Sequence, residues 1–214
     1  MNYFAHGREY VHDPYFLAGT AVPDWLNVVD RSVRVRSKQA IPYASSDNSP
    51  TAAIARGILQ HCRDDAWFHA TPAFAELSLE LCRMLRDALP RDDGFRPHFV
   101  GHILVEILLD AALVAEDPAR LERYYESLEA IDPTAVELAV NAMAARSTDR
   151  LKHFIPLFSR ERFLWDYADD AKLLMRLNQV MRRVGLPILP SGTEAVFAVA
   201  RELVYRQAPA LLAA

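Results

Sequence analysis

The sequence is poor in glycine, cysteine and excess positive charge, and each shortage excludes a class of protein. With 7 glycines in 214 residues, the chain offers few positions for hairpin turns, and no segment sustains an alternation of apolar and polar residues. Cys62 and Cys82 form no CxxC pair, so we expect reduced thiols and no disulfide framework. The 24 basic residues are outnumbered by 28 acidic ones, which argues against binding nucleic acid or anionic membranes by bulk charge.

Long apolar runs are also missing from the sequence. No stretch reaches the roughly 18 apolar residues that a membrane span needs, and the opening MNYFAHGREYVHDP lacks the apolar run of a signal peptide. We therefore expect a soluble, cytoplasmic protein without a membrane span. Hydrophobic residues still make up 51% of the chain, which is ample for a core.

What is present has the pattern of helices. Prolines repeatedly follow a residue with a capping side chain, and such pairs mark the first turn of a helix. The pairs are Asp13-Pro14, Ser49-Pro50, Thr71-Pro72, Asp117-Pro118 and Asp132-Pro133. Apolar residues at helical spacing follow them, as at Leu77, Leu81 and Leu85. The pattern predicts one all-α domain, a bundle of about eight helices over residues 1–214, with loops near residues 33–48 and 89–96.

Residues 57–72, GILQHCRDDAWFHATP, concentrate polar side chains in a run that otherwise has the pattern of a buried helix. In a helix, His61, Asp65 and His69 would line one face, because they are four residues apart. Two imidazoles and a carboxylate are costly to bury unless they bind something, and a divalent metal ion is the usual partner. The alternative is an exposed polar stripe in which Arg63 pairs with a neighbouring aspartate.

A second ladder of polar residues lies in the segment PHFVGHILVEILLD. It consists of His98, His102, Glu106 and Asp110. Buried carboxylates in so apolar a stretch need partners. Two ladders on two helices can face each other and enclose a metal ion. The alternative is a pair of buried salt bridges from these carboxylates to Arg83 or Arg86.

The histidines are distributed unevenly along the chain. Of 7, six precede residue 103, and only His153 lies in the C-terminal half. This asymmetry predicts a site built by roughly residues 1–116 and a helical buttress in roughly residues 117–214. His6 and Asp24, each among apolar neighbours, are further candidates, although either one alone is better explained as a capping or surface residue.

Three segments together resemble the acyl-carrier-protein phosphodiesterases, which are helical enzymes related to the HD-type metal phosphohydrolases. The segments are MNYFAH at the start, LAGTAVPDW at residues 17–25, and GILQHCRDDAWFHATP. The resemblance covers roughly the first half of the chain. It implies an HD-domain-like bundle in which His6, Asp24, His61 and Asp65 are site positions. The chain departs from the family at His69, where aspartate is usual, and at Gly101, where an aspartate usually precedes the histidine.

The resemblance implies a metal-dependent phosphoester hydrolase of the phosphodiesterase type, whose substrate group is carried on an acyl carrier protein. The ladders and the resemblance together give these expected metal ligands: His6, Asp24, His61, Asp65, His69, His98, His102 and Glu106. Expected catalytic residues are Asp65, Arg63 and Asp24, and expected phosphate-binding residues are Arg34, Arg36 and Lys38. The ion would be Mn²⁺, Mg²⁺, Fe or Zn²⁺, because a mixed set of histidines and carboxylates does not decide among them. The alternative is a non-catalytic helical protein that binds a metal ion or another ligand on the same scaffold.

Overall fold

The computed structural model describes residues 1–45, 47, 49–89 and 94–213. These residues form α-helices, short 3-10 helices and connecting turns, and no strand occurs among them. The prediction of an all-α protein is therefore confirmed. Eleven α-helices occur in these ranges, more than the eight or so that were predicted. Two of them, α1 (Tyr3–Gly7) and α3 (Ser37–Ala40), are too short to show a helical period in the sequence.

The chain divides into two compact units, and each is built from separate segments of the sequence. Unit 1 contains Met1, residues 3–66 and residues 117–162. Unit 2 contains Asn2, residues 67–116 and the chain from residue 163 onward. The boundary at residue 116, which the sequence suggested between site and buttress, is one of the points where the chain passes from one unit to the other.

Unit 1 has a core that is rich in aromatic side chains. Its elements are α1, η1 (Arg8–Tyr10), α2 (Pro14–Val29), α3, η2 (Ile41–Tyr43), α4 (Pro50–Phe68), α7 (Pro118–Glu129), α8 (Pro133–Met143) and α9 (Leu151–Glu161). The last two residues of α4 belong to unit 2. Phe4 contacts Tyr124 with ring centroids 5.8 Å apart, and Trp25 contacts Phe158 at 5.4 Å. Burying a ring such as Phe4 contributes about 2 kcal/mol, which is how so short a helix as α1 keeps its place.

Two glycines let α2 and α4 approach each other closely. A Cβ atom on Gly19 would clash with the carbonyl oxygen of Ile54, and one on Gly57 would clash with that of Phe16. The Cβ on Gly57 would also lie 2.8 Å from the Cα of Gly19, so the two glycines face each other. This crossing fixes the distance between the two helices just before the polar residues of α4.

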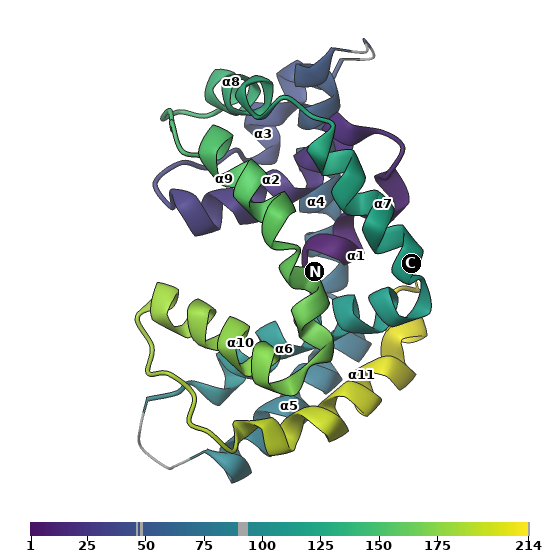
Figure 1. Ribbon diagram of the computed structural model, residues 1–214, viewed down its shortest axis with the longest axis vertical. Coiled ribbons are helices and arrows are strands. Elements are labelled where there is room, and N and C mark those ends of the chain that lie inside the picture. Colours follow the sequence, from purple (N-terminus) through teal and green to yellow (C-terminus); the bar gives the residue numbers. More distant parts are fainter. Residues whose placement is uncertain (46, 48, 90–93, 214) are drawn as a thin grey trace. The chain divides into compact units, whose positions relative to one another are not determined.

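Unit 2 is organised around α6 (Pro97–Glu116). Its other elements are α5 (Pro72–Ala88), η3 (Phe163–Ala168), α10 (Asp170–Val184), η4 (Thr193–Val196) and α11 (Phe197–Leu211). α5 and α11 both contact α6, and α5 runs beside it (Figure 1). A Cβ atom on Gly101 would lie 2.9 Å from the backbone nitrogen of Cys82, so the α5 backbone occupies the space of a side chain there.

α6 is the one helix in the described ranges that is long and apolar enough to cross a membrane, with a mean hydropathy of 1.7. This criterion considers only the length and composition of a helix, so a buried core helix meets it as well. Within the protein, 61% of the apolar window of α6 is buried, which fits a core helix.

All five predicted capping pairs begin helices. The side chains of Asp13, Ser49, Thr71, Asp117 and Asp132 each accept a hydrogen bond from a first-turn backbone N–H, at 2.9 to 3.2 Å. In each case the proline follows at the first helical position. The pattern of adjacent residues was therefore sufficient to place these helix starts.

The predicted loops differ in part from the structure. Val33 and Val35 are buried and Arg34 and Arg36 are exposed, but residues 37–43 form α3 and η2 instead of a loop. Residues 46 and 48 of that loop, and residues 90–93 of the loop predicted at 89–96, lie outside the described residues.

Candidate metal centres

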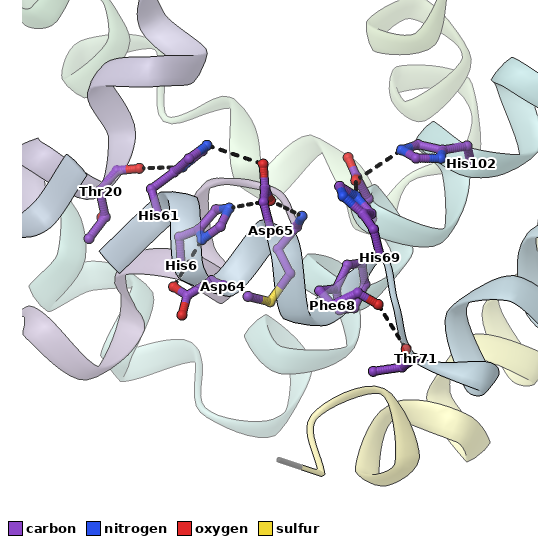
Figure 2. Close-up of polar contacts among 11 residues, drawn as sticks. His6, Thr20, His61, Asp64, Asp65, Phe68, His69, Thr71 and His102 are labelled. Atoms are coloured by element: carbon purple, nitrogen blue, oxygen red, sulfur yellow. Dashed lines mark hydrogen bonds and ion pairs between the residues drawn. The ribbon is translucent and has the colours of Figure 1, made fainter. Parts of the chain in front are cut away.

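The predicted ligands form two clusters, each inside one unit. The unit 1 cluster is His6, His61 and Asp65, and the unit 2 cluster is His69, His102 and Glu106 (Figure 2). In each cluster, one ligand atom per residue lies within 4.8 Å of the others. The ladder predicted along a single helix is divided, because α4 ends at Phe68 and His69 lies in the following turn.

His61 is oriented by two helices. On α4, its Nε2 lies 3.3 Å from Oδ2 of Asp65, one turn further along. From α2, the carbonyl oxygen of Thr20 lies 2.9 Å from its Nδ1. Because a carbonyl oxygen only accepts hydrogen bonds, Nδ1 carries the proton and Nε2 is directed at the carboxylate. Metal-binding histidines hold their second ring nitrogen in this way.

His6 approaches the same carboxylate from α1. Its Nδ1 lies 3.1 Å from Oδ2 of Asp64, and its Nε2 lies 3.2 Å from Oδ1 of Asp65. The Nε2 atom is buried and has no hydrogen bond of good geometry in the described part of the chain. The rings of His6 and His61 stack with centroids 4.1 Å apart. Two Nε2 atoms thus face one carboxylate, as Figure 2 shows, and a cation between them would satisfy all three groups.

Charge is tightly compensated in the unit 1 cluster. Burial by itself lowers the pKa of His6, but its contacts with Asp64 and Asp65 outweigh burial and raise that pKa to about 9. Burial raises the pKa of Asp65, but the contacts with His6 and His61 prevail and hold that pKa well below its usual range. The α-amino group of Met1 also donates to Oδ1 of Asp65, at 2.8 Å. The Asp65 carboxylate is therefore ionised and surrounded by nitrogen donors.

Two other predicted site residues of unit 1, Asp24 and Arg63, are not members of this cluster. Asp24 is half-buried on α2, and its charge contributes to the raised pKa of His6. Arg63 is exposed and donates to Oε1 of Gln60 at 2.7 Å, and Gln60 in turn donates to Oδ1 of Asp64 at 2.6 Å. The hydrogen bonds described for Arg63 thus lead to the cluster through Gln60, and the alternative pairing of Arg63 with a neighbouring aspartate is not what the structure shows.

The predicted phosphate-binding residues Arg34, Arg36 and Lys38 are exposed, in the segment between α2 and α4. Among the contacts of the described residues, none joins these side chains to His6, His61 or Asp65. Their role in binding phosphate stays a prediction.

Sequence reasoning missed the groups that orient the two histidines of unit 1. The acceptor for His61 is a backbone carbonyl, at Thr20, which leaves no trace in a side-chain pattern. The acceptor for His6 is Asp64, which is adjacent to Asp65. The adjacent Asp64 and Asp65, about one turn after His61, were a usable signal. One carboxylate of such a pair can face a metal ion while the other holds a second histidine, as Asp64 holds His6.

In the unit 2 cluster, both imidazoles contact one oxygen of Glu106. The Nε2 of His69 lies 2.8 Å from Oε1 and the Nε2 of His102 lies 3.3 Å from the same atom. Burial raises the pKa of Glu106, but His102 and His69 prevail and hold it below its usual range. The side chains of His69 and His102 are 34% and 33% exposed, so solvent reaches this cluster.

The other members of the second ladder are not in either cluster. His98 is exposed at the start of α6. Asp110 is buried and accepts a hydrogen bond from Nδ2 of Asn2 at 2.9 Å. The alternative was a buried salt bridge from Glu106 or Asp110 to Arg83 or Arg86. Among the described residues Arg83 pairs instead with Glu80 at 3.0 Å, and no ion pair joins Arg83 or Arg86 to either carboxylate.

No family model matches this chain, and no curated protein or solved structure matches it either. The resemblance to the acyl-carrier-protein phosphodiesterases therefore stays a prediction from the sequence motifs. What the structure adds is the geometry of two groups of residues that could hold a metal ion.

Proposed function

We propose that the unit 1 cluster binds a divalent metal ion and that the protein is a metal-dependent phosphoester hydrolase. One observation carries the metal site: Nε2 of His6 and Nε2 of His61 face the Asp65 carboxylate, while each Nδ1 is held by another acceptor. When bound, a divalent cation supplies Lewis-acid chemistry, because it polarises a phosphoryl oxygen and lowers the pKa of water.

The protein's own residues divide the remaining work. Asp64 and the Thr20 carbonyl fix the orientation of the two imidazoles, and Asp65 supplies the negative charge that retains a cation. We assign Asp24, the half-buried carboxylate that influences His6, to orienting a water molecule. Arg63 is exposed and anchored to Gln60, so its guanidinium is available to phosphate oxygens from solvent.

The class of substrate and of metal ion follows from the sequence motifs and from the ligand types. The motifs containing His6, Asp24, His61 and Asp65 resemble those of enzymes that cleave a phosphodiester on an acyl carrier protein, so that is the substrate class we propose. Two imidazoles among three ligands favour Mn²⁺, Fe or Zn²⁺ over Mg²⁺, which prefers oxygen ligands.

The test is Asp65→Asn, which keeps the shape of the side chain and removes its charge. Protein loaded with Mn²⁺ or Zn²⁺ is assayed on bis(4-nitrophenyl) phosphate and then on holo-acyl carrier protein. We expect turnover to fall roughly 100-fold or more, which corresponds to about 3 kcal/mol of transition-state stabilisation. The matched control is Asp149→Asn, the same change at an exposed position of unit 1, which should leave turnover unchanged.

Two results would contradict this function. If the wild-type protein binds metal yet hydrolyses neither compound, the alternative of a non-catalytic metal-binding protein is correct. If Asp65 is only a structural ion-pair partner, Asp65→Asn should lower the free energy of unfolding by about 3–5 kcal/mol. In that case the variant would retain full activity per folded molecule, and the catalytic assignment would be wrong.

A further inference from the structure

The unit 2 cluster is complete within its own unit. His69, His102 and Glu106 all lie in residues 67–116, and none of the ligands of the proposed hydrolase site in unit 1 takes part in it. The two clusters therefore share no ligand.

Three features hold the two imidazoles in position. Phe74 contacts both rings, with centroid distances of 4.9 Å to His69 and 4.8 Å to His102. The turn that carries His69 is closed by Thr71, whose Oγ1 donates to the Phe68 carbonyl oxygen at 2.8 Å and caps α5. The close approach of α5 to α6 at Gly101 fixes the helix on the residue before His102. Ring packing and backbone contacts thus position the two imidazoles.

The contacts of Glu106 show why a cation suits this position. One carboxylate oxygen, Oε1, faces both Nε2 atoms: it is hydrogen-bonded to Nε2 of His69 at 2.8 Å and lies 3.3 Å from Nε2 of His102. A single divalent ion can bind all three groups, whose ligand atoms lie within 4.8 Å of one another, since neutral imidazole nitrogens and a carboxylate are its ordinary ligands. Glu106 and His102 are one turn apart on α6, and the turn before α5 supplies the third ligand.

We propose that the unit 2 cluster binds a second metal ion, a divalent transition metal of the Zn²⁺ class, through His69, His102 and Glu106. Two imidazoles among three ligands favour Zn²⁺, Co²⁺ or Ni²⁺ over Mg²⁺ and Ca²⁺. A set of two histidines and one glutamate leaves a coordination position for water or a small anion. The ion links the turn before α5 to α6.

Exposure distinguishes this site from the one in unit 1. The side chains of His69 and His102 are about one-third exposed, whereas those of His6 and His61 are 0% and 6% exposed. A chelator in solution can reach the unit 2 ligands directly. The carboxylates differ in the opposite sense, since Asp65 is 35% exposed and Glu106 14%. Because both imidazoles of unit 2 are reachable, we expect EDTA to remove the unit 2 ion faster than the unit 1 ion.

The experiment begins with the His61→Ala protein, in which the unit 1 cluster lacks a ligand. Its binding of Co²⁺ is measured by equilibrium dialysis and by the visible absorption of the bound ion. We expect one Co²⁺ per chain, which the further changes His102→Ala or His69→Ala remove and which excess Zn²⁺ displaces. Glu106→Gln, which keeps the side-chain shape, should weaken binding at least 10-fold. The matched control is His98→Ala, which removes an exposed histidine of the same helix and should leave Co²⁺ binding unchanged.

The results are separable from those that test the hydrolase. A protein that binds Co²⁺ through His102 but cleaves no phosphodiester supports this site and contradicts only the proposed function. A His61→Ala protein that is folded by circular dichroism and binds no Co²⁺ would overturn the second site. Retention of the ion after both His69 and His102 are replaced would overturn it equally.

Discussion

The contacts of His6 with Asp64 and Asp65 favour its protonated form in the metal-free cluster, so that binding a metal ion through Nε2 displaces a proton. Its pKa is raised from 6.5 to about 9, because its contacts with Asp64 and Asp65 outweigh the effect of burial, which lowers that pKa. A group whose pKa is raised by folding stabilises the folded state fully at pH values below its unfolded-state pKa. This contribution is lost as the pH rises through the folded-state pKa. The metal-free protein should therefore lose stability between pH 6.5 and about 9, by up to about 3 kcal/mol.

The prediction is checked by urea unfolding at several pH values, with EDTA or with Zn²⁺ present. Zn²⁺ competes with the proton, so its apparent affinity should increase over the same pH range while the zinc-bound protein keeps its stability. Asp64→Asn removes a partner that raises the pKa of His6 and should move the loss of stability to lower pH. His12→Gln, at an exposed histidine, is the control and should change nothing. A flat stability profile in EDTA would contradict the assignment of a charged His6.

At the scale of the helices, the close crossings at glycine residues set the positions of the predicted metal ligands. At Gly57, an added methyl group would meet the Phe16 carbonyl oxygen, and a backbone atom cannot rotate away as a side chain can. Replacing glycine by alanine in a helix gains about 1 kcal/mol of propensity, but overpacking costs about 1–3 kcal/mol or more. We expect the cost to prevail, so Gly57→Ala should destabilise the protein and separate His61 from the Thr20 carbonyl.

The reciprocal change tests whether each crossing serves its own cluster. Gly101→Ala should push α5 away from α6 and weaken Co²⁺ binding in unit 2, while Gly57→Ala should weaken binding in unit 1. Each variant is the control for the other, because the chemical change is identical. Urea unfolding and Co²⁺ titration of both proteins provide the measurement. A Gly57→Ala protein with unchanged stability and metal affinity would show that the close approach is dispensable.

The sequence predicted the features that depend on neighbouring residues. The cap before each proline, such as Thr71 before Pro72, acts within one helical turn, and all five begin helices. The His61–Asp65 contact is also local, since residues four apart share a helix face. The same cap also limits the preceding helix, because a helix that begins at Pro72 requires the one before it to end ahead of Thr71, and the structure ends it at Phe68.

Features that depend on distant residues could not be predicted in this way. The acceptor of His61 is a main-chain carbonyl 41 residues earlier, and α1 and α3 are too short to show a period. The assignment of Phe4 to the same core as Tyr124 requires the tertiary fold itself. One sequence gives no information about such pairs, and the division into two interleaved units is their consequence.

At the scale of the whole molecule, each unit takes structure from both sides of residue 116. In unit 1, Phe4 packs on Tyr124 and Trp25 on Phe158. In unit 2, α6 packs against α11 as well as α5. Cutting the chain at residue 116 would therefore leave the first fragment with every ligand of both clusters but without the part of each core that residues 117–214 supply.

We expect a fragment of residues 1–116 to be largely unfolded and unable to bind metal. Phe4 and Trp25 would lose their partners Tyr124 and Phe158, and exposing them removes several kcal/mol of burial from a marginally stable fold. Mixing it with a fragment of residues 117–214 should restore helical content and Co²⁺ binding together. Circular dichroism and equilibrium dialysis follow both changes, and the intact chain at equal concentration is the reference. If residues 1–116 alone bound Co²⁺ with the affinity of the intact protein, the second half of the chain would be dispensable for both centres. Restoration of helix without metal binding would instead show that cores can assemble while the ligands of the crossing helices remain out of place.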